Sequence, residues 1–147
     1  MTTPLRYGII GCGMMGQEHI RNIALIDGAE VVAVYEPDPA MQAESAKLVP
    51  GLRFAGSIAD LLAMEEVNAL LIASPNFRHV DQLEEIAKLR ALPILVEKPL
   101  YTDPADAVRI ARLQADYPQI IWVAMEYRYM PPVAALLEQA ETATGGI

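Results

Sequence analysis

Three glycines follow a short apolar run near the start of the chain, with the spacing G-x-G-x-x-G. They are Gly11, Gly13 and Gly16, in the stretch GIIGCGMMGQEHI. In this pattern the first glycine permits a tight turn, the second lets a pyrophosphate approach the backbone, and the third lets a helix pack closely on a strand. Backbone N–H groups at the start of the next helix then face the phosphates. The stretch therefore predicts a dinucleotide-binding turn made by Gly11, Gly13, Met14, Met15 and Gly16.

An acidic residue, Glu36, lies 20 residues beyond Gly16, where the second apolar run ends. A carboxylate at this point accepts hydrogen bonds from the ribose hydroxyls of an adenosine and repels a 2′-phosphate. Pro37 follows it, where a protein that binds NADP often has an arginine. We therefore expect NAD as the cofactor and consider NADP the less favoured one. The alternative is a surface acid after a structural glycine turn.

A charged pair, Glu97 and Lys98, ends the apolar run in PILVEKPL, and Pro99 follows directly. A lysine amine held beside a nicotinamide can accept the proton of a hydroxyl while hydride leaves the carbon, and in its protonated form it stabilises a developing alkoxide. Proline fixes the direction of the chain just after the lysine, and its tertiary amide makes a cis bond accessible. Lys98 is the predicted catalytic residue. The alternative is a solvated ion pair at the edge of a sheet.

Polar residues also follow a fourth apolar run, in the segment SPNFRH, which contains Ser74, Pro75, Asn76 and His79. In an open α/β sheet, ligands bind outside the carboxyl ends of the strands. We therefore expect this segment to line the same crevice as the glycine turn. Helix capping is the alternative for Asn76, and packing beneath the crevice is the alternative for His79.

Two further reactive side chains lie close to the glycines. Cys12 stands between the first two, and a thiol near a helix start can be activated. A small residue is also what fits beside a dinucleotide, so we expect Cys12 to pack. His19 lies on the helix after the glycines, and we expect it to be packed and hydrogen-bonded rather than catalytic. The sequence predicts no metal site.

The elements that position these residues alternate between apolar runs rich in Val and Ile and stretches of helical period. The predicted strands are Arg6–Ile10, Glu30–Tyr35, Leu52–Ala55, Ala69–Ala73, Ile94–Val96 and Ile120–Met125. The predicted helices are Met14–Ile26, Pro39–Leu48, Ile58–Met64, Phe77–Leu89, Pro104–Asp116 and one more amphipathic helix after the prolines of YMPPVAALL. Strands that are continuously apolar are typical of a parallel sheet covered on both faces. The predicted fold is a doubly wound α/β domain.

Composition sets the broad class of protein. The chain has 147 residues, of which 53% are hydrophobic and 20% charged, and this fits one packed globular domain. Its formal net charge is −8, and no run of basic residues occurs, so we expect neither nucleic acid nor a membrane as a partner. One cysteine and the absence of a signal-like start favour the cytoplasm.

Four motifs in this order resemble the N-terminal half of the Gfo/Idh/MocA oxidoreductases. They are the glycine turn with its acid, SPNFRH, EKP and YRYMPP. The resemblance implies an NAD-dependent dehydrogenase that takes hydride from a secondary hydroxyl of a sugar, polyol or inositol-like substrate. It also implies that Lys98 is the active-site lysine, that Glu97 contacts the nicotinamide ribose, that Asn76 lines the nicotinamide side, and that Arg128 lies near the cofactor or the pocket entrance.

The same resemblance implies a division of the chain. Residues 1–124 are expected to form the NAD(P)-binding Rossmann domain, and residues 125–147 the linker and first helix of a truncated C-terminal substrate domain. The remainder of that α/β domain, which would supply the family's other catalytic residues and its usual oligomer contact, is expected to be missing from this chain. This chain alone is expected to bind cofactor and catalyse little. The alternative function is a non-catalytic nucleotide-binding sensor or regulatory module on the same fold.

Overall fold

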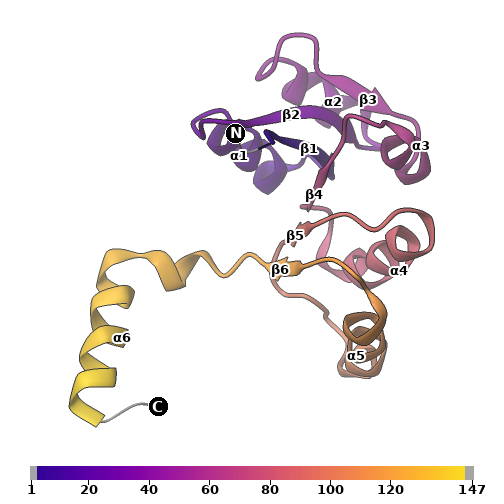
Figure 1. Ribbon diagram of the computed structural model, residues 1–147. Helices are drawn as coiled ribbons and strands as arrows, with labels where there is room; N and C mark the ends of the chain where they lie inside the picture. The colour runs from indigo at the N-terminus through magenta and orange to yellow at the C-terminus, as the bar shows by residue number, and fades with distance from the viewer. Residues whose placement is uncertain (1–2, 145–147) are drawn as a thin grey trace.

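The computed structural model describes residues 3–144, with side chains described through residue 140. Its centre is a six-stranded sheet in the order β3-β2-β1-β4-β5-β6, in which every neighbouring pair is parallel (Figure 1). The strands are β1 (Leu5–Ile10), β2 (Ala29–Tyr35), β3 (Arg53–Ala55), β4 (Ala69–Ile72), β5 (Ile94–Val96) and β6 (Ile121–Val123). The order reverses between β1 and β4, which is the doubly wound arrangement that the sequence predicted.

Helices connect the strands in turn. They are α1 (Met14–Ile23), α2 (Pro39–Ala46), α3 (Ile58–Ala63), α4 (His79–Leu89), α5 (Ala107–Asp116) and α6 (Pro131–Thr144), with three 3₁₀ helices, η1 (Asn76–Arg78), η2 (Pro104–Asp106) and η3 (Glu126–Tyr129). The predicted helices from Phe77 and Pro104 thus begin as 3₁₀ turns. The predicted Met14–Ile26 helix ends early because the N–H groups of Leu25 and Ile26 bond three residues back, in tighter turns.

The expected capping residues stand at three helix starts. The Asp38 carboxylate accepts from the Ala40 N–H at 2.8 Å, and the Ser57 hydroxyl accepts from the Asp60 N–H at 3.0 Å. Asp103 does the same for the N–H of Ala105, at the start of η2. Each cap satisfies a backbone donor that has no partner within its helix. The helix starts were therefore predicted more closely than the helix ends.

Both faces of the central strands are buried. Ile9 and Ile10 are adjacent in β1 and fully buried, yet they belong to different core clusters because successive side chains of a strand point to opposite faces. Ile10 packs in the cluster that includes Leu61 of α3 and Leu83 of α4, and Ile9 in the one that includes Ile20 of α1. Burial on both sides explains why these strands are apolar throughout.

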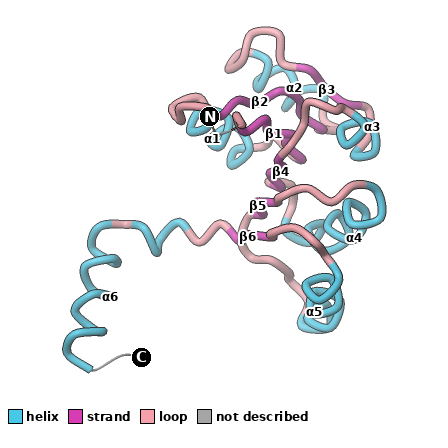
Figure 2. Tube along the Cα trace, in the orientation of Figure 1, coloured by secondary structure: helices cyan, strands magenta, loops and turns pink. Residues whose placement is uncertain are grey.

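The β6 side of the sheet is more exposed. The Trp122 side chain in β6 is half exposed, and beyond η3 the helix α6 projects away from the sheet (Figure 2). The predicted amphipathic helix after the prolines is thus present, and residues 145–147, which end the predicted segment 125–147, lie outside the described residues. Between residues 3 and 144 no helix has the length and apolar character needed to cross a membrane.

Candidate functional site

The carboxyl ends of the strands meet at one edge of the sheet. Because all strands are parallel, the residues that follow β1, β2, β4 and β5 emerge at this edge. Backbone hydrogen bonds continue to the end of the strands: the Gly11 N–H donates to the Tyr35 carbonyl and the Glu97 N–H to the Ile72 carbonyl, both at 2.9 Å. The glycine turn, Glu36, Ser74 and the Glu97–Lys98 pair are therefore held on a common, rigid edge.

The three glycines of the turn differ in what surrounds them. Gly11 has φ +89°, and a Cβ there would lie 2.6 Å from the backbone nitrogen of Ser74. A Cβ on Gly16 would overlap the carbonyl oxygen of Gly11. A Cβ on Gly13 would meet nothing within 4 Å. Gly11 and Gly16 are thus required by the fold itself, whereas Gly13 borders open space at the start of α1. Space of this kind is what a pyrophosphate needs to approach the backbone.

Met14 and Met15 are the first residues of α1, and their side chains point outward, with 81% and 37% of the surface exposed. The first N–H groups of a helix have no partner within it. The N-cap of α1 is Gly13, and no side chain caps this helix start. The start of α1 therefore has the arrangement that favours a bound anion.

Glu36 closes β2 and is nearly buried, with 9% of its surface exposed. One carboxylate oxygen accepts from the Cys12 N–H at 2.8 Å and the other from the Asp38 N–H at 3.0 Å. A carboxylate offers about four lone-pair positions, so two remain for other donors. The side chain is thus fixed in place and still able to accept hydrogen bonds from hydroxyl groups.

A cleft of about 380 Å³, here called the Glu36 cleft, joins the ends of β1, β2 and β4. Its lining residues are Ile10, Gly11, Tyr35, Glu36, Pro37, Ser74, Pro75, Phe77, Arg78 and Gln82. Sequence reasoning missed Gln82, which is buried and accepts a hydrogen bond of 2.5 Å from the Ser74 hydroxyl. The sequence feature that could have indicated Gln82 is its position one helical turn after His79, on the same face of the predicted helix.

The SPNFRH segment divides between the surface and the interior. Pro75 and Asn76 are exposed. The residue before η1 is Pro75, and no side chain caps this short helix, so the capping alternative for Asn76 is wrong. His79 is fully buried, with Nδ1 2.9 Å from the Pro99 carbonyl oxygen and Nε2 3.1 Å from that of Ser74. This position agrees with the packing alternative, and direct contact of His79 with a cofactor stays a prediction.

The EKP triplet presents one buried and one exposed side chain. Glu97 has 6% of its surface exposed, and its Oε1 lies 2.7 Å from Nε2 of His19. Its Oε2 accepts from the Lys98 backbone N–H at 3.2 Å. A solvated ion pair is therefore wrong for Glu97. Lys98 is exposed and is joined to Pro99 by a cis peptide bond. The sequence predicted that His19 would be packed and hydrogen-bonded, but it did not indicate that the partner of His19 is Glu97.

A second cleft, here called the Lys98 cleft, has a volume of about 370 Å³. It is lined by Lys98, Pro99, Met125, Glu126, Tyr127 and Arg128. The structure thus brings Arg128, from the 3₁₀ helix after β6, beside the predicted catalytic lysine. The neighbouring aromatic and methionine side chains make the walls of this cleft largely apolar.

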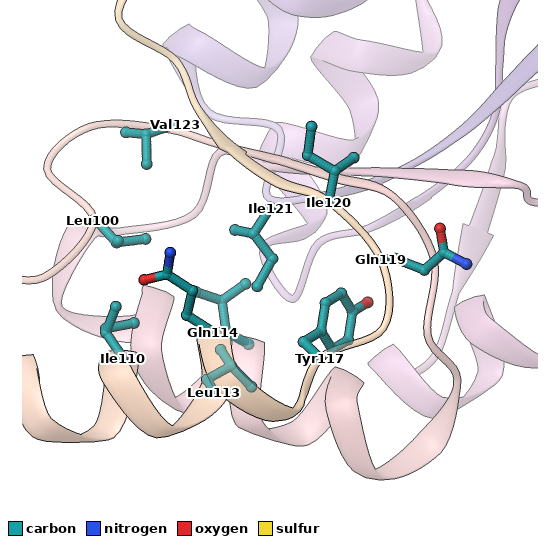
Figure 3. Close-up of a pocket in the computed structure, with 10 residues that line it drawn as sticks. Leu100, Ile110, Leu113, Gln114, Tyr117, Gln119, Ile120, Ile121 and Val123 are labelled. Carbon is teal, nitrogen blue, oxygen red and sulfur yellow. The ribbon is translucent and has the colours of Figure 1, made fainter.

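A third cavity, of about 400 Å³, lies between α5 and β6 and shares no lining residue with the two clefts (Figure 3). Aliphatic side chains such as Ile110, Leu113 and Ile121 face it. Its Tyr117 hydroxyl already donates to the Leu92 carbonyl and accepts from the Leu92 N–H. The cavity contains no ionisable pair or nucleophile, and it is not a candidate for chemistry.

Cys12 is buried under the glycine turn, and its thiol donates to the Met41 carbonyl at 3.5 Å. Burial raises the pKa of this thiol to about 11, although a hydrogen bond with Ser45 acts in the opposite direction. The thiol is therefore protonated near neutral pH, as expected for a packed residue. Within residues 3–144 there is no group of three or more His, Cys, Asp or Glu side chains placed to hold a metal ion.

Comparison with known proteins agrees with this site, which combines a dinucleotide turn, an acid after β2 and polar strand ends. The sequence profile of the family described as "Oxidoreductase family, NAD-binding Rossmann fold", GFO_IDH_MocA, matches residues 5–125. The chain belongs to this family. Family membership confirms the predicted Rossmann fold, the predicted resemblance and NAD as the cofactor.

Individual members of the family are also similar. Inositol 2-dehydrogenase of Corynebacterium glutamicum strain R is 37% identical over 150 residues, which is 99% of this chain and 44% of that protein. The structure of myo-inositol dehydrogenase from Lactobacillus casei, in complex with NAD(H) and myo-inositol, is 27% identical with a TM-score of 0.86, over 97% of this chain and 43% of that one. The WlbA dehydrogenase from Bordetella pertussis, in complex with NADH and UDP-GlcNAcA, is 26% identical with a TM-score of 0.84, over 95% and 42%.

The chain thus spans less than half the length of these relatives. The two complexes hold different small molecules besides the cofactor, myo-inositol in one and UDP-GlcNAcA in the other. The family profile covers residues 5–125 of the part that they share with this chain.

Proposed function

We propose that this chain is the cofactor-binding part of an NAD-dependent dehydrogenase that oxidises a secondary hydroxyl of an inositol, polyol or sugar. The observation that carries the proposal is the convergence of the glycine turn, Glu36 and Lys98 on one edge of a parallel sheet. Support for the substrate class comes from relatives named inositol 2-dehydrogenase and from the complex of one relative with NAD(H) and myo-inositol.

The cofactor would lie across the carboxyl edge of the sheet. Its pyrophosphate would occupy the open space beside Gly13, against the N–H groups of Met14 and Met15, because a glycine with nothing within 4 Å leaves room there. The adenosine ribose would bind the remaining lone pairs of Glu36, whose charge disfavours a 2′-phosphate. Ser74 and Pro75 line the same cleft, and they would contact the middle of the cofactor.

Lys98 would carry the proton transfer. Bound NAD⁺ supplies the hydride acceptor. When hydride leaves the substrate carbon, the hydroxyl proton would pass to Nζ of Lys98, and the carbon–oxygen bond would become a carbonyl. The walls of the Lys98 cleft are largely apolar, and they would limit the access of water to the reacting hydroxyl once the substrate is bound there. Glu97 would contact the nicotinamide ribose, and Asn76 would line the nicotinamide side of the cofactor site. Arg128 would lie near the cofactor or the entrance of the substrate pocket.

Several features of the whole protein belong to this proposal. Residues 1–124 would be the Rossmann domain and residues 125–147 the start of a substrate domain, since β6 ends at Val123 and η3 begins at Glu126. That second domain would complete the pocket and form a homo-oligomer contact. The protein would work in the cytoplasm on a small molecule, without nucleic acid or membrane partners, in line with its net charge of −8.

Cofactor binding is tested by titrating NADH and NADPH into the chain and following nucleotide fluorescence. We expect NADH to bind more tightly, and the Gly13→Ala variant to lose affinity for both without loss of thermal stability. Gly28→Ala, in a loop where a Cβ also meets nothing, is the matched control for binding. Equal affinity for NADH and NADPH would remove the role given to Glu36, and undiminished binding by Gly13→Ala would remove the proposed pyrophosphate site.

Catalysis is tested in a full-length protein that contains this chain together with the second part present in its relatives. With a panel of inositols, polyols and sugars, Lys98→Ala should abolish turnover while NADH affinity stays within a few-fold. Lys88→Ala, an exposed lysine on α4, should leave turnover unchanged. Retained turnover, or loss of NADH binding in Lys98→Ala, contradicts the catalytic assignment. Absence of turnover with every substrate would favour a non-catalytic module.

A further inference from the structure

The chain has two histidines, and both contact the segment Glu97–Pro99 from different sides. His19 comes from α1, and His79 is the first residue of α4. Neither side chain lines the Lys98 cleft or the Glu36 cleft. Their rings instead approach the residues immediately before and after Lys98. Such contacts act on the position of the lysine rather than on a ligand.

His19 acts on the side before the lysine. Its Nε2 lies 2.7 Å from Oε1 of Glu97, across 78 positions of sequence. The other oxygen of the same carboxylate accepts from the Lys98 backbone N–H at 3.2 Å. Since 8% of the Glu97 side chain and 19% of the His19 side chain are exposed, the pair is largely shielded from water. A continuous path of hydrogen bonds therefore runs from α1 to the backbone of Lys98.

His79 acts on the side after the lysine. Its Nδ1 lies 2.9 Å from the Pro99 carbonyl oxygen, and its Nε2 lies 3.1 Å from the Ser74 carbonyl oxygen. The ring is fully buried and spans the gap between the end of β4 and the turn after β5. Both of its partners are acceptors, so a neutral ring donates to one of them at a time and a protonated ring to both.

We propose that His19 and His79 are positioning residues that fix the backbone on either side of Lys98 and so aim its Nζ into the Lys98 cleft. The inference rests on the proposed function, because positioning Lys98 matters for the reaction only if Lys98 is the catalytic residue. A lysine side chain has four rotatable bonds and an exposed head in this structure, so its reach is defined only if its Cα is held. A displacement of about 1 Å at a catalytic group can lower a rate by about 100-fold.

The test measures how well NADH shields Lys98 from acetylation. The chain contains three lysines, Lys47, Lys88 and Lys98, so peptide mass spectrometry can follow trace acetylation of each, with the first two as internal references. NADH is set at ten times the dissociation constant of each variant, which removes differences in affinity. At that concentration about one protein in eleven is free, and acetylation of a fully shielded lysine slows about tenfold.

For His19 the informative pair of variants is His19→Leu and His19→Gln. Leucine has no donor, and we expect shielding of Lys98 to fall from about tenfold to less than about threefold, because the segment is no longer held on one side. The glutamine Nε2 can take the place of the histidine Nε2 and donate to Glu97, so this variant should recover most of the shielding. Full shielding in His19→Leu, or none in His19→Gln, contradicts the positioning role of His19.

For His79 the pair is His79→Asn and His79→Gln. The asparagine amide nitrogen corresponds to Nδ1 and can reach the Pro99 carbonyl, whereas the glutamine amide nitrogen corresponds to Nε2 and can reach that of Ser74. The Pro99 contact is the one next to Lys98. We therefore expect NADH to shield Lys98 from acetylation more strongly in His79→Asn than in His79→Gln. Equal shielding in the two variants contradicts the role of His79.

Tyr117→Phe controls for a general loss of stability. Its hydroxyl bonds Leu92, before the other end of β5, so this variant weakens the same strand without touching the Glu97–Pro99 segment. It should keep the tenfold shielding. If it loses shielding as His19→Leu does, stability alone explains the data and the inference is wrong. If NADH binds but does not shield Lys98 in the unaltered chain, the site proposed for Lys98 fails first, and the inference fails with it.

Discussion

The crevice edge of the sheet and the outer surface of α4 and α5 both carry groups of charged side chains, but the two regions are built differently. At the crevice, the carboxylates of Glu36 and Glu97 are buried, and each bonds to groups brought from distant parts of the chain. On the outer surface, Arg109 bonds Asp81, Glu84 and Asp106, all at 2.7 Å and all partly exposed. This group is here called the Arg109 cluster.

The difference lies in what surrounds the charges. Water solvates the Arg109 cluster and salt screens it, so its ion pairs contribute little to the free energy of unfolding. The crevice carboxylates accept from backbone N–H groups in a water-poor setting, where loss of a partner is costly. Charges at the crevice thus fix geometry, whereas charges on the outer surface mainly join two helices. Four predictions test this contrast.

The largest effect is expected at Gly11, which closes the glycine turn. In Gly11→Ala the new Cβ would lie 2.6 Å from the Ser74 backbone nitrogen at a φ of +89°, so we expect a loss of more than about 3 kcal/mol in the free energy of unfolding. Urea denaturation followed by circular dichroism measures it. Gly28→Ala has a similar φ of +79° with no neighbour within 4 Å and should lose only about 1–2 kcal/mol. Equal losses would mean that crowding at the turn is unimportant.

Glu36→Ala comes second. It removes the acceptor of the buried Cys12 N–H and of the Asp38 N–H, and a loss of about 2 kcal/mol is expected in the same urea experiment. The control is Glu44→Ala, an exposed acid that pairs with Lys47 on the surface, which should stay within about 0.5 kcal/mol of the unaltered chain. If the two variants lose equal stability, the contrast between buried and exposed carboxylates is lost.

Alkaline pH should produce the third effect, through Cys12. Its pKa is about 11 in the folded chain against an ordinary 9.0, so its stabilising contribution is complete below pH 9.0 and is lost as the pH rises towards 11. Between about pH 8 and pH 10, the unaltered chain should lose about 1 kcal/mol more than Cys12→Ala does, because only the former has a thiol that ionises on unfolding. Parallel pH profiles for the two chains would argue against a buried, protonated thiol.

The smallest effect is expected for Arg109→Met. The variant leaves three carboxylates near one another on the surface, and the melting temperature should fall by at most about 2 °C. Hydrogen bonding by Arg109 lowers the pKa of Glu84, so what stability this pair adds is present above the unfolded pKa of Glu84 and disappears as the pH falls through the folded value. Added salt should reduce the difference further. A drop as large as that of Glu36→Ala would show that the outer charges also organise the fold.

Much of the crevice was predictable because its signals are local. The spacing of Gly11, Gly13 and Gly16 determines which backbone conformations a turn can adopt, and the apolar runs indicate strands buried on both faces. The contacts of the two histidines were not predictable in the same way. His19 and Glu97 are 78 positions apart, and no periodicity relates a helical residue to the end of a strand four strands later.

The sequence by itself determined the fold class, the dinucleotide turn, the acid after β2 and the position of Lys98 at a strand end, because short-range sterics and hydrophobic periodicity specify these features. Only the tertiary structure decided that Glu97 is buried while Lys98 is exposed, that Gly13 borders open space, and that His19 and His79 approach opposite sides of Lys98. These outcomes depend on which strand ends and helices come together at one edge of the sheet. That meeting is set by the packing of both faces of the sheet as a whole.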